Sequence, residues 1–296
     1  MHVFVTGASG WIGSATVTEL LAAGHQVTGL ARSDRSAATV AALGAAVRRG
    51  DLRDLDVLRD AAGSADAVVH LGYHHDFSQM EEAARLDLAA IETFGAALAG
   101  TGRSLLIASG VVGLAVGRAA TERDNFDVGI HPRSANAVAA LALAEKGVRP
   151  LVVRFAPTVH GAGDHGFIAT LVAIARERGV SAYVGDGANR WPAVHRDDAA
   201  ALVRLAVEGA PAGSSLHAVA DEGVPARAIA EAIGRGLDLP VASVTGEQAM
   251  GHFGWIGRFF AADLPTSSLV TRESLGWKPT HPSLLDDLEA GVYFNG

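Results

Sequence analysis

The stretch Thr6-Gly7-Ala8-Ser9-Gly10-Trp11-Ile12-Gly13 decides the fold of this chain. It lies between an apolar run at 3–5, which is a predicted strand, and a predicted helix at about 11–23. In its G-x-x-G-x-x-G spacing, the first glycine permits a tight turn, the second clears space for a pyrophosphate, and the third lets helix and strand pack closely. The helix N-terminus then offers N–H groups and partial positive charge to an anion. We therefore predict a dinucleotide-binding turn whose contacts come from Gly7, Ser9, Gly10, Trp11 and Ile12.

The rest of the chain alternates apolar runs with amphipathic segments. Further strands are predicted at 26–31, 45–48, 67–71, 105–109 and 151–155, and helices at 37–43, 55–62, 80–99 and 134–145. Continuous apolar strands alternating with helices indicate a parallel sheet covered on both faces. Later helices are predicted at 166–178, 197–208, 225–236 and 284–291, with short strands near 216–219 and 241–244.

We therefore expect an α/β fold of the Rossmann type, a doubly wound parallel sheet with a smaller C-terminal substrate lobe. The expected division is a cofactor-binding domain at 1–155 and a substrate-binding lobe at 156–296. The chain is expected to cross between the two more than once.

Composition excludes several classes of protein. The chain has no Cys, so zinc–cysteine sites, disulfides and a cysteine nucleophile are excluded. With 24 Lys+Arg against 32 Asp+Glu it lacks the basic footprint of a nucleic-acid-binding protein. No apolar run reaches the roughly 20 residues that span a membrane, and the N-terminus lacks the basic region of a signal peptide. We expect a cytoplasmic protein with a small-molecule substrate, no membrane partner and, since no metal-ligand spacing is found, no metal.

The end of the second strand chooses between the two nicotinamide cofactors. An NAD site commonly has Asp or Glu there to hold the ribose 2′-hydroxyl. This chain has Arg32 and Ser33, which can bind a 2′-phosphate, so NADP(H) is the predicted cofactor. Asp34 is the competing residue for an NAD-type contact, and an exposed loop arginine is the plainer explanation of Arg32.

Two further strand ends carry predicted cofactor contacts. Asp51 follows the third strand and can accept from the adenine amino group while Leu52 packs on the ring; a helix N-cap is the alternative role of Asp51. Leu71 and Gly72 end the fourth strand, where a glycine lets the backbone pass close to the cofactor.

These features resemble the extended short-chain dehydrogenase/reductase family, of the kind labelled NAD-dependent epimerase/dehydratase. The resemblance covers essentially the whole chain through the ordered segments at 6–13, 51–52, 70–72, 109–110, 154–161, 184–187, 194–200 and 275–279. It implies that Ala156 and His160 lie beside the cofactor, and that Tyr183, Arg190 and Trp191 line the substrate pocket. An ion pair with Asp186 or Asp197 is an alternative for Arg190. A homodimer is common in the family and is expected by analogy.

The chain departs from the family at its catalytic pair. The family uses a Ser, a Tyr and a Lys four residues after the Tyr. Ser109 ends the fifth strand and matches the Ser. The following helix reads His131-Pro132-Arg133-Ser134-Ala135-Asn136, without Tyr or Lys. The only tyrosines are Tyr73, Tyr183 and Tyr293, and none has a Lys four residues later, so the chain resembles an atypical subgroup.

Other residues must then take over the missing roles. Tyr73, after the fourth strand, is the candidate proton donor, and Arg133, at the start of the helix, is the candidate for polarising a substrate oxygen. The plainer explanations are that Tyr73 is an ordinary lining residue and that Arg133 is a surface charge at the start of the helix. His131, His160 and His195 titrate in the useful range, although structural roles are at least as plausible for the last two.

The sequence predicts an NADP-dependent oxidoreductase, in the first place an NADPH-dependent reductase, acting on a carbonyl or alcohol of a small organic molecule. Ser109, Tyr73 and Arg133 are the predicted catalytic residues. An epimerase or dehydratase that recycles its cofactor is one alternative. A non-catalytic NADP-binding sensor is another, because the Tyr–Lys pair is absent.

Overall fold

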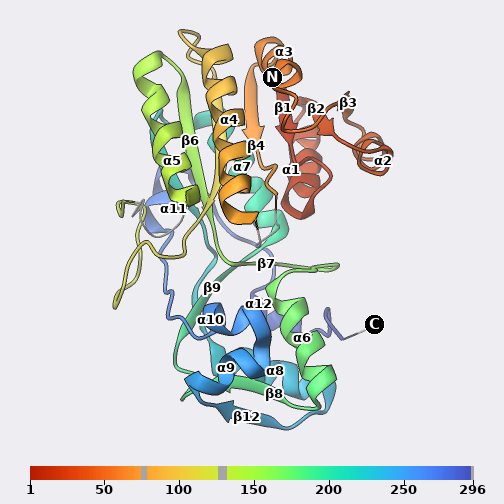
Figure 1. The fold of residues 1–296 in the computed structure, drawn as a ribbon, viewed down its shortest axis with the longest axis vertical. Helices are drawn as coiled ribbons and strands as arrows, with labels where there is room; N and C mark the ends of the chain where they lie inside the picture. Colours follow the sequence, from red (N-terminus) through yellow and green to blue (C-terminus); the bar gives the residue numbers. More distant parts are fainter. Residues whose placement is uncertain (75–78, 126–131, 295–296) are drawn as a thin grey trace.

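The computed structural model describes residues 1–74, 79–125 and 132–294, which form a larger lobe around a parallel sheet and a smaller lobe below it (Figure 1). Within these residues the main sheet has seven strands in the order β10-β6-β5-β4-β1-β2-β3. Every neighbouring pair is parallel. The strands are β1 (His2–Thr6), β2 (Gln26–Ala31), β3 (Ala46–Arg49), β4 (Ala67–His70), β5 (Ser104–Gly110), β6 (Arg149–Phe155) and β10 (Ser214–Ala218). The predicted doubly wound sheet is confirmed.

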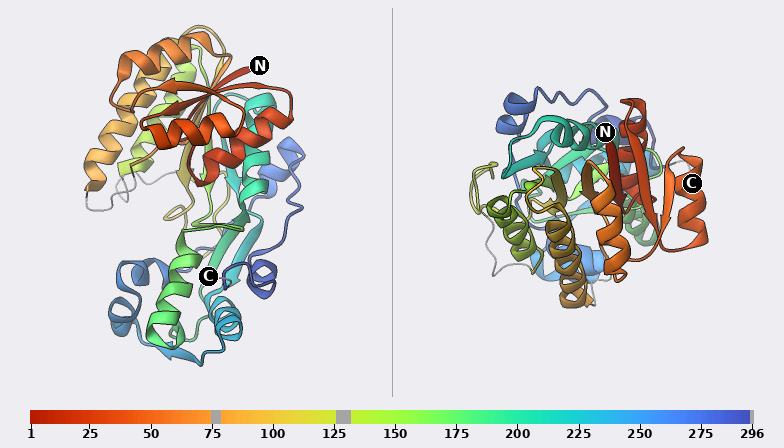
Figure 2. Two further views of the ribbon diagram at one scale, coloured as in Figure 1. Left: turned by 90° about the vertical axis from the view of Figure 1, so that its right-hand side faces the viewer. Right: turned by 90° about the horizontal axis from the view of Figure 1, so that it is seen from above.

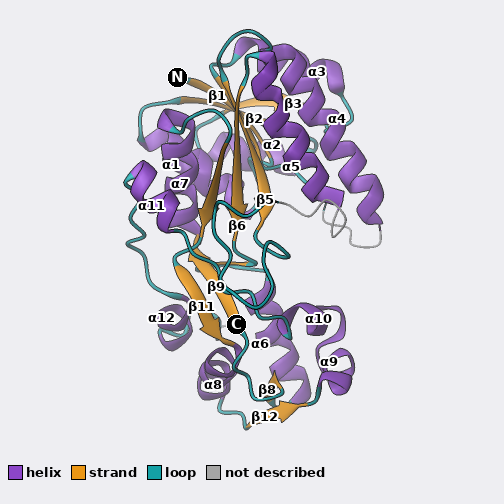
Figure 3. Ribbon diagram, turned by 90° about the vertical axis from the view of Figure 1, so that its left-hand side faces the viewer, coloured by secondary structure: helices purple, strands orange, loops and turns teal. Residues whose placement is uncertain are grey.

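Helices cover both faces of this sheet (Figure 3). One face packs on α1 (Trp11–Ala22), α2 (Asp34–Ala42) and α7 (Arg196–Gly209). The other packs on α3 (Leu55–Ser64), α4 (Met80–Leu98) and α5 (Pro132–Ala142), which continues into the short helix η2 (Leu143–Lys146). The strand order reverses direction between β1 and β4, and ligands of such sheets bind outside the carboxyl ends of the strands at that point.

The smaller lobe contains two small sheets. One has the order β11-β9-β7, from β7 (Thr158–His160), β9 (Arg190–His195) and β11 (Asp221–Pro225), and the other pairs β8 (Ser181–Val184) with β12 (Val241–Val244). A separate apolar core lies among the lobe's helices. These helices are α6 (Phe167–Arg178), α8 (Ala226–Leu237), α9 (Gly246–Phe253), η3 (Gly254–Ile256), α10 (Gly257–Phe260) and α12 (Leu284–Glu289).

The sequence analysis missed several of these elements, namely β7, β8, β9, β11, the helices between 246 and 260, and α11 (Leu269–Leu275). The chain also returns from the smaller lobe to the main sheet through α7 and β10. Figure 2 shows α7 beside α1. No helix among the described residues combines the length and the apolar character needed to cross a membrane.

A buried polar cluster braces the sheet beside β10. His217 Nδ1 donates to the Ser267 carbonyl over 2.7 Å, and its Nε2 faces Arg154 at 3.3 Å. Glu122, from the loop after β5, accepts from the Thr271 amide and hydroxyl over 2.7 and 2.6 Å. Burial lowers the pKa of His217 to about 4. The folded chain therefore keeps this ring neutral where the unfolded chain would protonate it.

We predict an acid-dependent loss of stability that depends on His217. Between the usual His pKa of 6.5 and about 4, only the unfolded state binds the proton, so stability falls as the pH drops through this window and levels off below it. The loss attributable to His217 is roughly 3 kcal/mol at most. Denaturant unfolding at several pH values should show a smaller decline for His217→Asn, which retains the donor to Ser267. Parallel pH profiles for the two proteins would contradict the prediction.

Candidate functional site

The phosphate-binding turn closes at a point where three backbone segments meet. Gly7 has a φ of +68°, and a Cβ there would lie 2.7 Å from the Gly72 nitrogen. A Cβ on Gly13 would lie only 2.0 Å from the Gly7 carbonyl oxygen. The first and third glycines are therefore required by close packing, and the Gly10 amide closes the turn on the Gly7 carbonyl over 2.9 Å.

A polar side chain joins this turn to the end of β4. The Thr6 hydroxyl accepts a hydrogen bond from the Gly72 amide over 3.0 Å and lies 2.6 Å from His70 Nδ1. The Leu71 amide donates to the Thr6 carbonyl over 3.3 Å. Leu71 and Gly72 thus lie directly beside the turn, at the reversal point of the sheet.

The end of β2 presents an exposed Arg32 beside the start of α2. The Ser33 side chain caps α2 by accepting from the Ser36 amide over 3.2 Å. The competing carboxylate, Asp34, is paired with Arg49 of β3 over 2.7 Å. At the end of β3, Asp51 Oδ1 accepts from the Arg53 amide over 3.1 Å.

The N-cap residue of α3 is Asp54. Asp51 therefore does not have the N-cap role that was its alternative explanation. Leu52 is partly buried and packs against the core under α3 and α4.

Trp11 connects the turn to the smaller lobe. Its indole N–H donates to the Val159 carbonyl over 2.7 Å. The Arg196 guanidinium lies 4.4 Å from the centre of its ring, and His165 meets it edge-on with centroids 5.8 Å apart. The first residue of α1 therefore contacts both the segment after β7 and the start of α7.

The candidate catalytic residues lie on the same edge of the sheet. Ser109 is buried near the end of β5. Because His70 of β4 is level with Ile107 of β5, Gly72 and Ser109 each lie two residues further toward the same edge. The Arg133 guanidinium lies 4.1 Å from the centre of the Tyr73 ring. The structure thus brings Tyr73 and Arg133 together, whereas His131 lies outside the described residues.

Burial dominates the electrostatics of this pair. Burial raises the pKa of Tyr73, the Arg133 charge opposes the rise, and Asp87 adds to it. Burial also lowers the pKa of Arg133, but an arginine stays cationic at ordinary pH. At neutral pH the pair is therefore a protonated phenol against a guanidinium cation.

Sequence reasoning did not predict that three polar residues meet behind this pair, and it missed Asp87 altogether. His70, Asp87 and Asn136 are all buried. The sequence did hold a sign that Asp87 is buried, because Asp87 lies on the apolar stripe of α4 with Ala83, Ala90 and Phe94. An acid on such a stripe needs buried partners.

Ala156 and His160 lie at the junction of the lobes. The Ala156 amide donates to the Ala218 carbonyl over 3.2 Å. His160 is fully buried and its Nδ1 lies 2.6 Å from Asp287 of α12. His195 caps α7 by accepting from the Asp197 amide, and burial lowers its pKa. Both histidines thus have structural partners.

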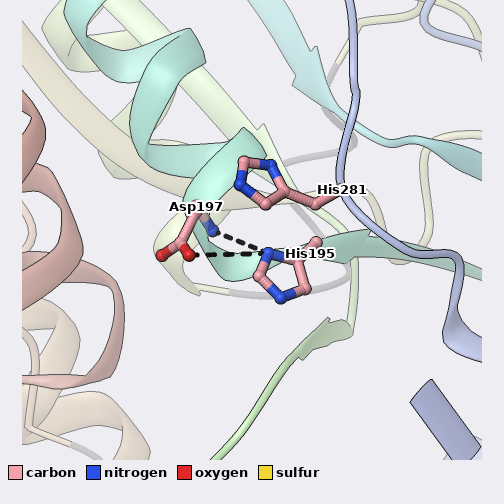
Figure 4. Close-up of side chains that lie close together, drawn as sticks. All are labelled: His195, Asp197 and His281. Carbon is pink, nitrogen blue, oxygen red and sulfur yellow. Dashed lines mark hydrogen bonds and ion pairs between the residues drawn. The ribbon is translucent and has the colours of Figure 1, made fainter. Parts of the chain in front are cut away.

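A group with metal-ligand chemistry occurs beside them, which the sequence analysis did not foresee. His195, Asp197 and His281 offer ligand atoms within 4.8 Å of one another (Figure 4). The two rings are stacked, with centroids 4.7 Å apart and planes 7° apart. The ring nitrogens therefore direct their lone pairs within two separate, nearly parallel planes, and His195 Nδ1 already accepts a hydrogen bond from the Asp197 amide. This geometry is poorly suited to holding one ion, and we assign none to it.

The expected substrate-pocket residues lie apart from this edge. Tyr183 is half-buried in β8, with the Arg227 guanidinium 5.5 Å from its ring centre. Arg190 forms a two-point ion pair with Asp263, over 3.0 and 2.8 Å, and not with Asp186 or Asp197. Trp191 is fully buried in the core of the smaller lobe. Their substrate contacts stay predictions.

The chain is similar to known proteins in sequence and in fold. An uncharacterized protein of Schizosaccharomyces pombe, C2A9.02, is 48% identical over 295 residues, covering 99% of this chain and 100% of that one. Another from Saccharomyces cerevisiae, YLL056C, is 41% identical over 298 residues, covering 100% of both chains. The crystal structure of DesIV, a dTDP-glucose 4,6-dehydratase from Streptomyces venezuelae with NAD bound, superposes with a TM-score of 0.77. Its identity is 22%, covering 99% of this chain and 96% of that one, which shows the fold alone.

The model of the NAD dependent epimerase/dehydratase family matches residues 3–218. That span contains the glycine turn, the strands of the main sheet from the second residue of β1 onward, and the candidate catalytic edge. The chain therefore belongs to this family of NAD(P)-dependent oxidoreductases, epimerases and dehydratases.

Proposed function

We propose that this protein is an NADP-dependent oxidoreductase, in the first place an NADPH-dependent reductase of a carbonyl group in a small organic molecule. The observation that carries the cofactor choice is the end of β2. Arg32 is exposed there, and the competing Asp34 is paired with Arg49 over 2.7 Å. An arginine suits a 2′-phosphate, whereas an NAD site commonly holds the ribose with a carboxylate.

The residues at the turn fit a dinucleotide. A Cβ would overlap backbone at Gly7 and Gly13, and the N-terminus of α1 opens at the same place. Gly7, Ser9, Gly10, Trp11 and Ile12 would hold the pyrophosphate. The remaining contacts in this proposal come from Arg32, Ser33, Asp51, Leu52, Leu71, Gly72, Ala156 and His160.

The catalytic edge supplies the proton and the placement of the substrate. The bound NADPH supplies the hydride. Ser109 donates a hydrogen bond to the substrate oxygen, and Tyr73 gives its proton to that oxygen as negative charge develops. Arg133 stabilises the phenolate that Tyr73 leaves, because its charge lies against the ring. Tyr183, Arg190 and Trp191 stay the predicted substrate side.

The family also contains epimerases and dehydratases, and the DesIV likeness keeps a recycled cofactor as the second candidate. Net oxidation of NADPH with a ketone, aldehyde or quinone separates the reductase from that alternative. Tight NADPH binding without turnover would support the non-catalytic sensor. The cytoplasmic location, the homodimer and a domain boundary near residue 155 also stay predictions.

We predict that Arg32→Ala weakens NADPH binding about 10- to 100-fold, the effect of losing a charge-assisted contact with the 2′-phosphate. NADH lacks that phosphate, so its affinity should change less than about threefold. Calorimetric dissociation constants for both cofactors measure this. Arg48→Ala, on the neighbouring strand β3, is the matched control. Equal losses for the two cofactors would rule out the assigned role of Arg32.

We predict that Ser109→Ala and Tyr73→Phe each lower turnover about 10²- to 10⁴-fold, the usual contribution of a positioned proton donor or acceptor. The NADPH dissociation constant should stay within about threefold, because neither side chain belongs to the turn. NADPH absorbance with a panel of carbonyl compounds gives the rates, and Tyr293→Phe, which removes a hydroxyl that donates to Asp164 over 2.9 Å, controls for loss of a tyrosine hydroxyl. Full turnover in both variants would remove these residues from the mechanism.

A further inference from the structure

A buried ionised carboxylate lies at the centre of the polar group behind Tyr73 and Arg133. Asp87 Oδ2 accepts from Asn136 Nδ2 over 2.7 Å, and His70 Nε2 lies 3.2 Å from Asp87 Oδ1. Asn136 also donates to the Ala84 carbonyl over 2.8 Å. Three elements, β4, α4 and α5, therefore meet at one carboxylate.

This carboxylate is held as an anion. Burial alone would raise the pKa of Asp87, but His70, Arg133 and Asn136 outweigh it and hold the pKa below its usual range. An apolar side chain would commonly fill such a position at no cost in stability. A buried anion here needs another explanation, and its contacts with functional elements provide one.

The contacts run in two directions. Toward the substrate edge, Asn136 lies one helical turn after Arg133 on α5, so both face the same side of that helix. Arg133 in turn lies 4.1 Å from the Tyr73 ring centre. Toward the phosphate-binding turn, His70 Nδ1 lies 2.6 Å from the Thr6 hydroxyl. That hydroxyl accepts a hydrogen bond from the Gly72 amide over 3.0 Å.

We propose that Asp87 is a positioning residue which, with Asn136 and His70, holds Arg133 against Tyr73 and ties that pair to the phosphate-binding turn. In this way Asp87 gives Tyr73 a fixed charged neighbour, as the lysine of the Tyr–Lys pair does for the tyrosine elsewhere in the family. This inference rests on the proposed function, because it assigns a support to the proton donor named there.

The test reads the ionisation of Tyr73 without substrate or cofactor. Arg133 and Asp87 are the charged groups that act on Tyr73 among the described residues. Tyrosinate absorbance is followed against pH after rapid mixing, and each protein is paired with its Tyr73→Phe counterpart, so that the difference belongs to Tyr73. Asn136→Ala is made in the wild-type chain and in Arg133→Met. It removes no charge, so it leaves the two charges that act on Tyr73 in the chain and tests their placement.

Asn136→Ala should raise the pKa of Tyr73 by about 0.5 to 1 unit in the wild-type chain, because Arg133 leaves the ring. In the Arg133→Met chain the same change should have almost no effect. Asn189→Ala, which removes an amide bonded to the Phe260 carbonyl in the smaller lobe, is the control and should leave Tyr73 unchanged. Equal shifts in both backgrounds, or none in either, would overturn the proposal.

Asp87→Asn is the second variant, used where near-ultraviolet circular dichroism shows a native fold. Its direct charge effect lowers the pKa of Tyr73, and this effect is present in both backgrounds. Only the wild-type background has an Arg133 that can lose its place. The pKa of Tyr73 should therefore end higher, relative to its parent protein, in the wild-type background than in the Arg133→Met background. Identical shifts would again refute positioning through Arg133. Turnover of Tyr73→Phe tests the proposed function separately, so failure of the positioning role and failure of the proposed function give different results.

Discussion

The site depends on the contact of Gly13 with the Gly7 carbonyl, where no side chain fits. A Cβ on Gly13 would lie 2.0 Å from that oxygen. This approach sets α1 against β1, and the turn closes through the Gly10 amide on the Gly7 carbonyl with the N-terminus of α1 at the reversal point of the sheet. A Cβ on Gly7 would lie 2.7 Å from the Gly72 nitrogen, so the segment that follows β4 also packs closely against the turn. The place that the proposed function gives to the pyrophosphate thus follows from backbone packing.

The smaller lobe is tied to this turn and not only to the sheet. The indole N–H of Trp11 donates to the Val159 carbonyl, and the face of its ring contacts the Arg196 guanidinium. Two chain segments that enter and leave the smaller lobe therefore contact the first residue of α1. In the proposed function these contacts link the segment that holds the pyrophosphate to the lobe that is proposed to bind the substrate.

The sequence predicted the parts of the fold whose physics is local. Strands buried on both faces read as continuous apolar runs, so β4 was predicted at 67–71, close to its observed bounds of 67–70. Strand β9 was missed because it contains Pro192 and begins with a charged residue, and its pairing partners lie far along the chain. The Tyr73–Arg133 contact was not predictable, since it joins a loop and a helix 60 residues apart. Asp87 was overlooked although its place on an apolar stripe marked it as buried and paired.

The character of the Tyr73–Arg133 pair bears on the direction of the proposed reaction. A lysine beside a catalytic tyrosine can release its proton, whereas an arginine supplies charge alone. Oxidation of an alcohol needs a phenolate as base, but burial and the Asp87 anion both raise the pKa of Tyr73. Reduction needs only the protonated phenol, which is the form present at neutral pH, and an alkoxide forming on the substrate is basic enough to take its proton. In the proposed function this protonated pair suits reduction, and burial of the phenol is the main influence that keeps the proton on Tyr73.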